Sequence, residues 1–209
     1  MEQTEMIKIF DDNKKEIGVA TREEAHSKGF WHKTFHCWFY NKDNGRVSMY
    51  LQKRSNKKQD YPGLLDITAA GHILSNETVS DGVREVTEET GIRVSFSDLI
   101  PLGVINYCVT NEDIGFIDKE IAHVFLYEAN HSFDDFRLSL EEVSGIVKVD
   151  FNDFSSLWLG KTNEIKIEGF DTDQSGERLY VCKNVGKEAF VPHELEYYKR
   201  VIYLMGKAI

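Results

Sequence analysis

The feature that most constrains this chain is the stretch of residues 71–92, GHILSNETVSDGVREVTEETGI. Its second half predicts a helix that begins after Thr78 and ends at Gly91, since glycine readily adopts the left-handed conformation that stops a helix. Thr78 and Asp81, three residues apart, fit a capping box at the helix start. One buried stripe is predicted by apolar or small residues in steps of four, three and four: Val79, Val83, Val86 and Thr90.

The opposite face of this helix crowds three carboxylates, those of Glu85, Glu88 and Glu89. Like charges at helical spacing cost about 0.2–0.5 kcal/mol per pair, and anions are disfavoured near a helix C-terminus. Arg84 offsets part of this cost by pairing with Glu88. Two interpretations stand: a solvated acidic helix, or a site for a hard cation such as Mg²⁺, which prefers oxygen ligands. The strand–loop–helix setting and the Arg–Glu pair favour the cation site.

The stretch resembles the Nudix box, whose pattern is Gly, five residues, Glu, seven residues, then Arg-Glu-apolar-x-Glu-Glu-x-Gly-apolar. Gly71 and Glu77 fit the first half, and residues 84–92 fit the second half throughout. One departure is that six residues, 78–83, separate Glu77 from Arg84. Counting backward from Arg84 would put Ala70 and Asn76 at the Gly and first Glu positions. We favour counting forward, with a one-residue deletion before the helix.

This resemblance implies an α+β fold, an α/β/α sandwich around a mixed sheet in which the box forms loop–helix–loop. It implies Mg²⁺-dependent hydrolysis of a diphosphate linkage in a nucleoside-diphosphate-type or related small molecule, with Mn²⁺ as a substitute metal. Glu85, Glu89 and Glu88 are the expected metal ligands, and Arg84 would hold the glutamates in place. The expected general base is Glu88, Glu85 or Glu120.

Within the superfamily, four segments look most like the branch that includes isopentenyl-diphosphate isomerase: Trp31-His32, Gln52-Lys53-Arg54, Tyr61-Pro62-Gly63 and Ala70-Gly71-His72. The isomerase cysteine that moves a proton is replaced here by Ala70, which has no proton to move. By the same resemblance, His32 and His72 match metal ligands, and Asp118 and Glu120 match loop carboxylates. Two rival functions follow, an isoprenoid-diphosphate isomerase and a non-catalytic ligand-sensing module. Ala70 argues against the first, and the retained glutamates argue against the second.

Arg54 and Lys58 belong to a basic run, residues 53–58, in an otherwise acidic protein. The run is either a solvated hairpin end or an anion clamp, and the resemblance places Arg54 and Lys58 on the diphosphate. Gly71 follows a predicted strand at residues 64–69, and its missing side chain permits close approach of a ligand. For His26, His32 and His36, a structural role at a strand end is favoured, with His32 the exception.

Composition limits the function classes. The net charge of −10 argues against a general nucleic-acid or anionic-membrane binder. Three widely spaced cysteines without a CxxC motif favour a reducing compartment. No apolar stretch is long enough to span a bilayer. We therefore expect a cytoplasmic protein that binds neither nucleic acid nor membrane. The partner that the resemblance implies is a small-molecule diphosphate.

The chain divides into three predicted parts. Residues 1–29 form an N-terminal hairpin extension, residues 30–160 a Nudix hydrolase domain, and residues 161–209 a C-terminal extension whose amphipathic helix, 192–205, packs on the domain. The terminal segments raise the prospect of a homodimer. The stripe expected on the C-terminal helix consists of Leu195, Tyr198, Val201, Ile202 and Met205. Further strands are expected at residues 6–10, 16–20, 31–40, 46–54, 102–110, 118–127 and 178–182, and a further helix at 150–159.

Overall fold

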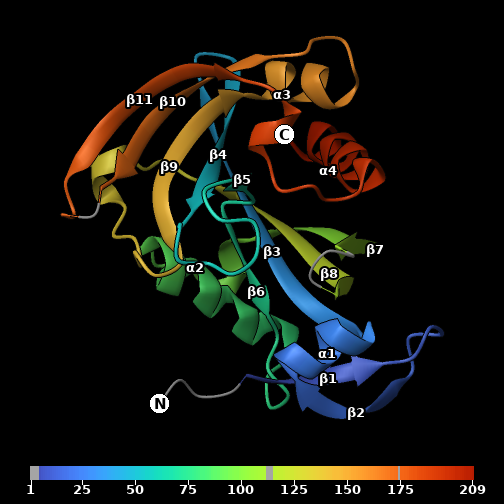
Figure 1. Ribbon diagram of the computed structural model, residues 1–209. Coiled ribbons are helices and arrows are strands. Elements are labelled where there is room, and N and C mark those ends of the chain that lie inside the picture. The colour runs from blue at the N-terminus through green and yellow to red at the C-terminus, as the bar shows by residue number, and fades with distance from the viewer. Residues whose placement is uncertain (1–4, 112–114, 174) are drawn as a thin grey trace.

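A single mixed sheet organises the protein, as a computed structural model of residues 5–111, 115–173 and 175–209 shows (Figure 1). Its strands are β1 Met6–Phe10, β2 Glu16–Thr21, β3 Trp31–Asp43, β4 Arg46–Arg54, β5 Leu65–Asp66, β6 Ala69–His72, β7 Ile100–Asn111, β8 Phe116–Glu128, β9 Val143–Asp150, β10 Ile165–Thr172 and β11 Arg178–Val185. The helices are α1 Arg22–Lys28, α2 Arg84–Thr90, α3 Phe151–Trp158 and α4 Leu195–Ala208, with a 3₁₀ turn, η1 Val79–Val83, before α2.

Strand β3 is the centre of the sheet. It pairs antiparallel with β1, β4 and β6, and parallel with β8. The main strand order is β11-β10-β9-β4-β3-β1-β2, with β7 attached to β8. The strand predicted at residues 31–40 is therefore present, and it is central and mostly buried.

Alternate residues of β3 serve two separate cores. Trp38 and Tyr40 pack into a core shared with α3 and α4, whereas Phe35, Cys37 and Phe39 pack into a core shared with α2. Helices therefore cover both faces of the sheet (Figure 1). The expected α/β/α sandwich is confirmed.

The helix predicted within residues 71–92 begins as the 3₁₀ turn η1 and continues as α2 from Arg84. The predicted capping box forms, because the backbone N–H of Thr78 donates to the Asp81 carboxylate at 2.8 Å. Gly91 ends α2 in the left-handed conformation, with φ of 74°. A Cβ at Gly82 would lie 2.7 Å from the Phe35 side chain, so η1 packs directly onto β3.

The predicted strand at residues 64–69 consists of two short strands. β5 pairs with β4, and β6 pairs with β3, so the chain crosses between neighbouring strands at Ile67 and Thr68. The Thr68 hydroxyl accepts from the backbone N–H of Phe39 at 2.9 Å and donates to the carbonyl of Tyr50. This crossing carries the following residues, Ala69–His72, to the middle of the sheet.

The predicted N-terminal hairpin is present and extends the sheet. β1 pairs with both β2 and β3, and Thr21 caps α1 by accepting the backbone N–H of Glu24 at 3.1 Å. A Cβ at Gly29 would lie 2.9 Å from the Ile117 side chain. Helix α1 is thus packed against β8.

The C-terminal residues also extend the sheet, through β10 and β11, and then form α4. Four residues of its predicted stripe are buried: Tyr198, Val201, Ile202 and Met205. The prediction for Leu195 is wrong, because α4 begins at this residue and its side chain is 43% exposed. Tyr197 is buried in its place. The three-part division stays a prediction, and one sheet runs across both of its boundaries.

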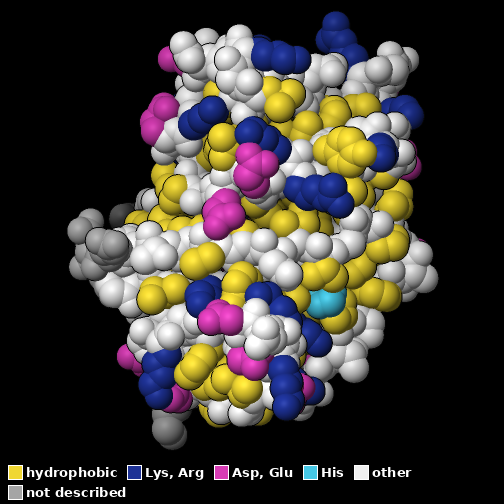
Figure 2. Space-filling view, turned by 90° about the vertical axis from the view of Figure 1, so that its right-hand side faces the viewer, with side chains coloured by type: hydrophobic (Ala, Val, Ile, Leu, Met, Phe, Trp, Pro, Cys, Tyr) yellow, Lys and Arg dark blue, Asp and Glu magenta, His cyan; other side chains and the backbone are white. Residues whose placement is uncertain are grey.

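Two features are relevant to nucleic-acid and membrane binding: the distribution of charge on the surface, and the length and apolar character of the helices. On the face shown in Figure 2, lysine and arginine side chains are scattered among acidic and apolar ones and do not form a continuous basic stripe. Among the described helices, none combines the length and the apolar character needed to cross a bilayer.

Candidate active site

A cavity of about 350 Å³ opens between the sheet, α1, α2 and the segment that precedes α4. Sequence reasoning selected eight residues as catalytic, metal-binding or substrate-binding, and every one of them borders this cavity: Arg54, Lys58, Gly71, Arg84, Glu85, Glu88, Glu89 and Glu120. They come from β4, the following loop, β6, α2 and β8. The fold thus gathers residues up to about a third of the chain apart into one site.

Arg84, the first residue of α2, holds several carboxylates in place. Its guanidinium donates to Glu77 Oε1 and Glu85 Oε1 at 2.6 Å, and to Glu88 Oε2 at 2.9 Å. It also donates to the carbonyl of His72 at 3.1 Å. The predicted Arg84–Glu88 pair is confirmed. Because a guanidinium presents its donors in a rigid fork, this arrangement fixes the carboxylates relative to β6.

Glu77 occupies the site that forward counting from Gly71 predicts for it. Both carboxylate oxygens accept from Arg84, at 2.6 and 3.1 Å, and Oε2 also accepts the backbone N–H of Leu74 at 2.9 Å. The shorter loop before α2 is taken up by η1, so the missing residue does not separate Glu77 from Arg84. In this structure Glu77 acts on Arg84 and does not meet the other glutamates directly.

Glu85 and Glu89 are two carboxyl groups largely removed from solvent. Glu85 shares the Arg84 guanidinium with Glu77 and Glu88, and Glu89 forms no ion pair within the described residues. Burial raises the pKa of Glu85 to about 7. Glu89 is only 7% exposed; burial and, second, the Glu85 carboxylate raise its pKa well above the ordinary value. Glu89 Oε2 accepts the backbone N–H of Ala70 at 3.0 Å. A bound cation would favour the ionised form of both groups, so this pair fits a divalent metal.

Gly71 has a different neighbour from the one expected. A Cβ at Gly71 would lie 2.2 Å from Cδ of Glu85 and 2.3 Å from its Oε1. The space left by the missing side chain therefore holds the Glu85 carboxyl group. In contrast, Glu88 has a 57% exposed side chain and reaches out toward solvent.

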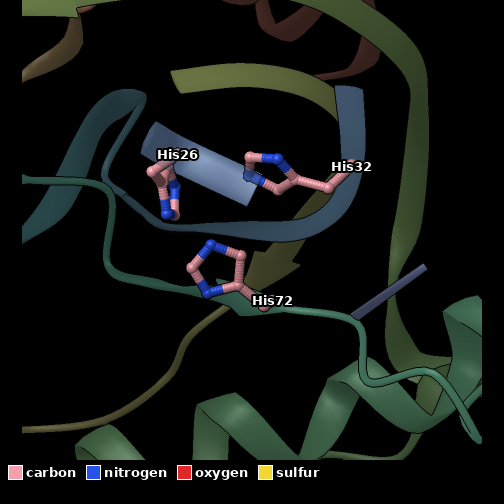
Figure 3. Close-up of side chains that lie close together, drawn as sticks. All are labelled: His26, His32 and His72. Atoms are coloured by element: carbon pink, nitrogen blue, oxygen red, sulfur yellow. The ribbon is translucent and has the colours of Figure 1, made fainter. Parts of the chain in front are cut away.

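Three imidazole rings, those of His26, His32 and His72, lie close together (Figure 3). His26 comes from α1, His32 from β3 and His72 from β6, and their ring centroids are 4.8–5.3 Å apart. Asp118 and Glu120 from β8 join them: one ligand atom each of His32, Asp118 and Glu120 lie within 4.8 Å of one another. Asp118 and Glu120 are two residues apart on β8, and both side chains are turned toward the histidines.

Two buried atoms in this histidine–carboxylate cluster lack an ordinary partner. His32 Nε2 and Asp118 Oδ1 are 3.3 Å apart, yet neither makes a hydrogen bond of acceptable geometry within the described chain. His26 Nε2 also lies 3.3 Å from the same oxygen. Burial lowers the pKa of His72 to about 4, so its ring is neutral and able to ligate a metal. This donor set fits a divalent transition metal such as Mn²⁺.

His26 was expected to be structural, and it instead belongs to this cluster. Its Nδ1 lies 2.9 Å from the carbonyl of Arg22, which leaves Nε2 directed at Asp118. His36 does have the structural role expected of it, since its two nitrogens meet Tyr197 and Glu120 at 2.7 and 2.9 Å.

One carboxylate oxygen of Glu120 receives three donors. Glu120 Oε2 lies 2.9 Å from the Thr34 hydroxyl, 2.6 Å from the Tyr107 hydroxyl and 2.9 Å from His36 Nε2. Donors of this kind favour the ionised carboxylate and fix its orientation. The other oxygen, Oε1, accepts no hydrogen bond from the residues that the structure describes, and Glu120 borders the cavity.

The basic side of the cavity is formed by Arg54 and Lys58. Arg54 donates to Asp66 Oδ2 at 3.1 Å and twice to the carbonyl of Asp60, and Lys58 pairs with Glu142. Both side chains therefore border the cavity with fixed orientations, in keeping with the anion-clamp interpretation.

The cavity residues that sequence reasoning did not assign to the site include Arg22, His26, Asp66 and His193. Arg22 and His26 lie in α1, outside the predicted catalytic domain, and reach the site because α1 packs on β8. His193 lies before α4 and pairs with Asp66 at 2.8 Å. Local periodicity carries no signal for such contacts between distant segments.

The comparisons with known proteins agree with this geometry. The model of the NUDIX domain matches residues 30–167. An uncharacterized Nudix hydrolase of Clostridium acetobutylicum is 36% identical over 201 residues, which is 96% of each chain. The isopentenyl-diphosphate Delta-isomerase of Pectobacterium atrosepticum is 32% identical over 126 residues, 60% of this chain and 66% of that protein. Nudix hydrolase 3 of Arabidopsis thaliana is 33% identical over 137 residues, and the match covers only 17% of its length.

Solved structures share the fold at low sequence identity. A protein of Deinococcus radiodurans, DR0079, superposes with a TM-score of 0.54 at 15% identity, over 73% of this chain and 87% of the other. A MutT/nudix family protein of Enterococcus faecalis gives the same TM-score of 0.54 at 12% identity, over 84% and 61%. Together with the matched domain and the relative that spans almost the whole chain, these likenesses lead to one conclusion: the chain belongs to the Nudix hydrolase family.

Proposed function

We propose that this protein hydrolyses a diphosphate linkage in a nucleoside-diphosphate-type or related small molecule, with Mg²⁺ as the metal and Mn²⁺ as a substitute. The observation that carries the proposal is the meeting, in one cavity, of the buried carboxyls of Glu85 and Glu89 with the cations Arg54 and Lys58. Carboxylates suit a hard metal ion, and the two cations suit the phosphates that such an ion binds. Membership of the Nudix family supports the same reaction class.

Glu85, Glu89 and Glu88 would hold the metal, oriented by Arg84. When bound, a divalent ion would neutralise charge on the phosphates and lower the pKa of a coordinated water. The histidine–carboxylate cluster offers further ligands, and His26, His72, Asp118 and Glu120 of this cluster border the same cavity. His32 and His72 are the ligands that the isomerase resemblance implies.

Glu88 is the best placed of the three candidate general bases. Its side chain is 57% exposed, and its one hydrogen bond within the described residues is the one from Arg84. The Glu88 carboxylate is therefore free to approach a water molecule in the cavity. Glu85 is packed against Gly71, and Glu120 Oε2 is already held by three donors.

Arg54 and Lys58 would bind the diphosphate. Asp66 and the Asp60 carbonyl pre-orient the Arg54 guanidinium, so less freedom is lost on binding. Lys58 would exchange its ion pair with the half-exposed Glu142 carboxylate for one with a phosphate.

The test is a product-release assay on a panel of nucleoside diphosphate sugars, ADP-ribose and dinucleoside polyphosphates, in Mg²⁺, Mn²⁺ or EDTA. We expect metal-dependent turnover of at least one compound. Glu89→Gln should lower kcat by at least about 100-fold, because the metal supplies several kcal/mol of transition-state stabilisation. Glu196→Gln, which changes an exposed glutamate of α4 paired with Lys199, is the matched control. Full activity of Glu89→Gln would remove the assignment.

Isomerisation of isoprenoid diphosphates is the second candidate, favoured by the isomerase relatives and by the histidine–carboxylate cluster. Ala70 carries no group that exchanges a proton, so we expect no conversion of isopentenyl diphosphate. Conversion in that assay would replace the hydrolase proposal. Binding of panel compounds without any turnover would instead favour the ligand-sensing module. The homodimer and the cytoplasmic location stay predictions.

A further inference from the structure

The segment that precedes α4 is anchored beside the cavity by backbone contacts. The N–H of Val191 donates to the carbonyl of Leu65 at 2.9 Å, and Phe190 forms a bridge to the same residue of β5. The Tyr198 hydroxyl donates to the carbonyl of Val191 at 2.7 Å. These contacts fix residues 190–193 over β5, although they lie beyond residues 30–167, the part that matches the family.

This anchoring delivers His193 to Asp66, which is 5% exposed. Each Asp66 oxygen serves a different side chain: Oδ1 lies 2.8 Å from His193 Nε2, and Oδ2 accepts from Arg54 at 3.1 Å. One carboxylate thus sets the positions of the imidazole and of the guanidinium proposed to hold the diphosphate. His193 and Arg54 are in consequence neighbours on the cavity wall.

The second nitrogen of the His193 ring is left for a ligand. Nδ1 makes no hydrogen bond to any residue within the described ranges, and the ring borders the cavity together with Gly71, Glu85 and Glu120. The aromatic rings around it carry polar groups, with Tyr107 at 5.5 Å, Tyr197 at 5.1 Å and His36 at 6.4 Å between centroids. The Tyr107 and Tyr197 hydroxyls are bound to Glu120 and His36, so the His193 ring packs against a network of polar groups behind the cavity.

Asp66 also favours the doubly protonated ring. Burial alone would lower the pKa of His193, but the Asp66 carboxylate outweighs it and raises the pKa above its ordinary value. A protonated ring held at Nε2 by Asp66 presents an N–H donor at Nδ1.

We propose that His193 is a specificity-determining residue. It donates a hydrogen bond to the chemical group that is attached to the diphosphate of the substrate. The substrate then carries an oxygen acceptor there, such as a sugar hydroxyl or a nucleobase carbonyl, and not an apolar chain. This inference rests on the proposed function, since Arg54 is taken to bind the diphosphate itself.

The experiment compares two ligands that differ in that group. One is the best substrate of the panel, and the other is methylenediphosphonate, which has a diphosphate-like end and nothing beyond it. His193→Ala should raise KM for the substrate about tenfold or more, the effect of losing one hydrogen bond to a charged donor, with a smaller change in kcat. The inhibition constant of methylenediphosphonate should change less than about twofold. His193→Asn keeps an N–H donor and should recover part of the affinity.

The control is His131→Ala, because His131 lies after β8, away from the cavity, with Nε2 on the Tyr127 hydroxyl at 3.2 Å. It should leave both ligands unaffected. Thermal unfolding of each variant shows whether it is folded. If His193→Ala does not fold, the comparison of His193→Asn with wild type tests the role of His193. An equal loss for both ligands, or no loss for either, would overturn the role of His193.

Calorimetry separates this inference from the proposed hydrolysis. If wild type binds ADP-ribose or UDP-glucose without cleaving it, the hydrolase proposal fails, while the same comparison of variants by dissociation constant still decides the role of His193. Preferential binding of isopentenyl diphosphate over the polar compounds would overturn the inference, and so would wild type that binds none of these ligands.

Discussion

The carboxyl group of Glu85 lies where a side chain on residue 71 would begin, with its Cδ 2.2 Å from the position of a Cβ on Gly71. The glycine of β6 and the glutamate of α2 are therefore one structural unit. A glycine at this position is required because the carboxyl group must pass close to the strand to reach the cavity.

Gly71→Ala should displace Glu85 and lower kcat about 100-fold, the cost typical of a shift of about 1 Å in a catalytic group. The measurement is turnover of the best panel substrate, with circular dichroism to show that the fold is kept. Gly206→Ala is the matched control, because a Cβ there would meet its nearest atom at 4.0 Å, and alanine favours the α4 helix. Wild-type activity in Gly71→Ala would show that Glu85 does not need its present position.

Arg84→Gln should separate the carboxylates of Glu77, Glu85 and Glu88 from their common donor. We expect a 10- to 100-fold loss of activity, the usual effect of removing a residue that orients metal ligands. The apparent affinity for Mg²⁺ should fall with it, which a metal titration of activity would measure. Arg93→Gln, at an exposed arginine just after α2, should leave both quantities unchanged. A variant at Arg84 with normal metal affinity would contradict the orienting role.

The stability of the metal-free protein should depend on pH through Glu85. Its pKa is about 7 in the folded protein against an ordinary value of 4.5, so the folded state keeps a proton that the unfolded chain loses. The free energy of unfolding therefore falls as pH rises from about 4.5 to about 7, by on the order of 2–3 kcal/mol. Urea unfolding in EDTA at pH 5 and pH 7.5 measures this fall, and Glu85→Gln should abolish the Glu85 part of it.

His72 acts in the opposite direction at the lower end of that range, since burial lowers its pKa to about 4 and stability gained from it rises with pH up to about 6.5. Wild type and Glu85→Gln both contain His72. The difference between their free energies of unfolding therefore reports the contribution of Glu85 alone. Addition of Mg²⁺ should flatten the dependence, because the cation favours the ionised carboxylate. Identical pH profiles for the two proteins would contradict the assignment.

Metal binding should raise the melting temperature. A site filled at a hundredfold its dissociation constant adds about 2.7 kcal/mol, equivalent to roughly 5–10 °C for a chain of this size. Glu89→Gln should cut the shift produced by Mg²⁺ or Mn²⁺ by at least half, each variant being compared with its own metal-free form. The metal-induced shift of His32→Gln tests in the same way whether the histidine–carboxylate cluster binds the metal. His131→Gln is the control for this variant. Equal shifts in all four proteins would place the metal elsewhere.

Much of the fold could be predicted from local pattern. The hairpin at residues 6–21, the aromatic strand β3, its partner β4, and the box helix with its glycine stop follow from alternation, turn residues and caps. Strands β9 and β10 were not predicted. β9 is buried on both faces, so it lacks the alternation that marks a strand, and its place between β4 and β10 is decided by long-range pairing.

For the candidate site, the box and its resemblance predicted the residues that a motif contains. They did not predict His26 or His193, because these residues reach the cavity through the packing of α1 on β8 and of residues 190–193 on β5. Such contacts join segments far apart in sequence, and they leave no periodic trace in either segment. The close fit of Glu85 against Gly71 is likewise visible only in three dimensions.

Trimming the chain to the matched residues 30–167 would carry a cost that follows from the sheet. The cut at 167 falls inside β10, Ile165–Thr172, and the cut at 30 removes the hairpin that pairs with β3. Both would leave raw strand edges, which invite aggregation. The same fragment would lack Arg22, His26 and His193, so an inactive or insoluble fragment would say little about the activity of residues 1–209.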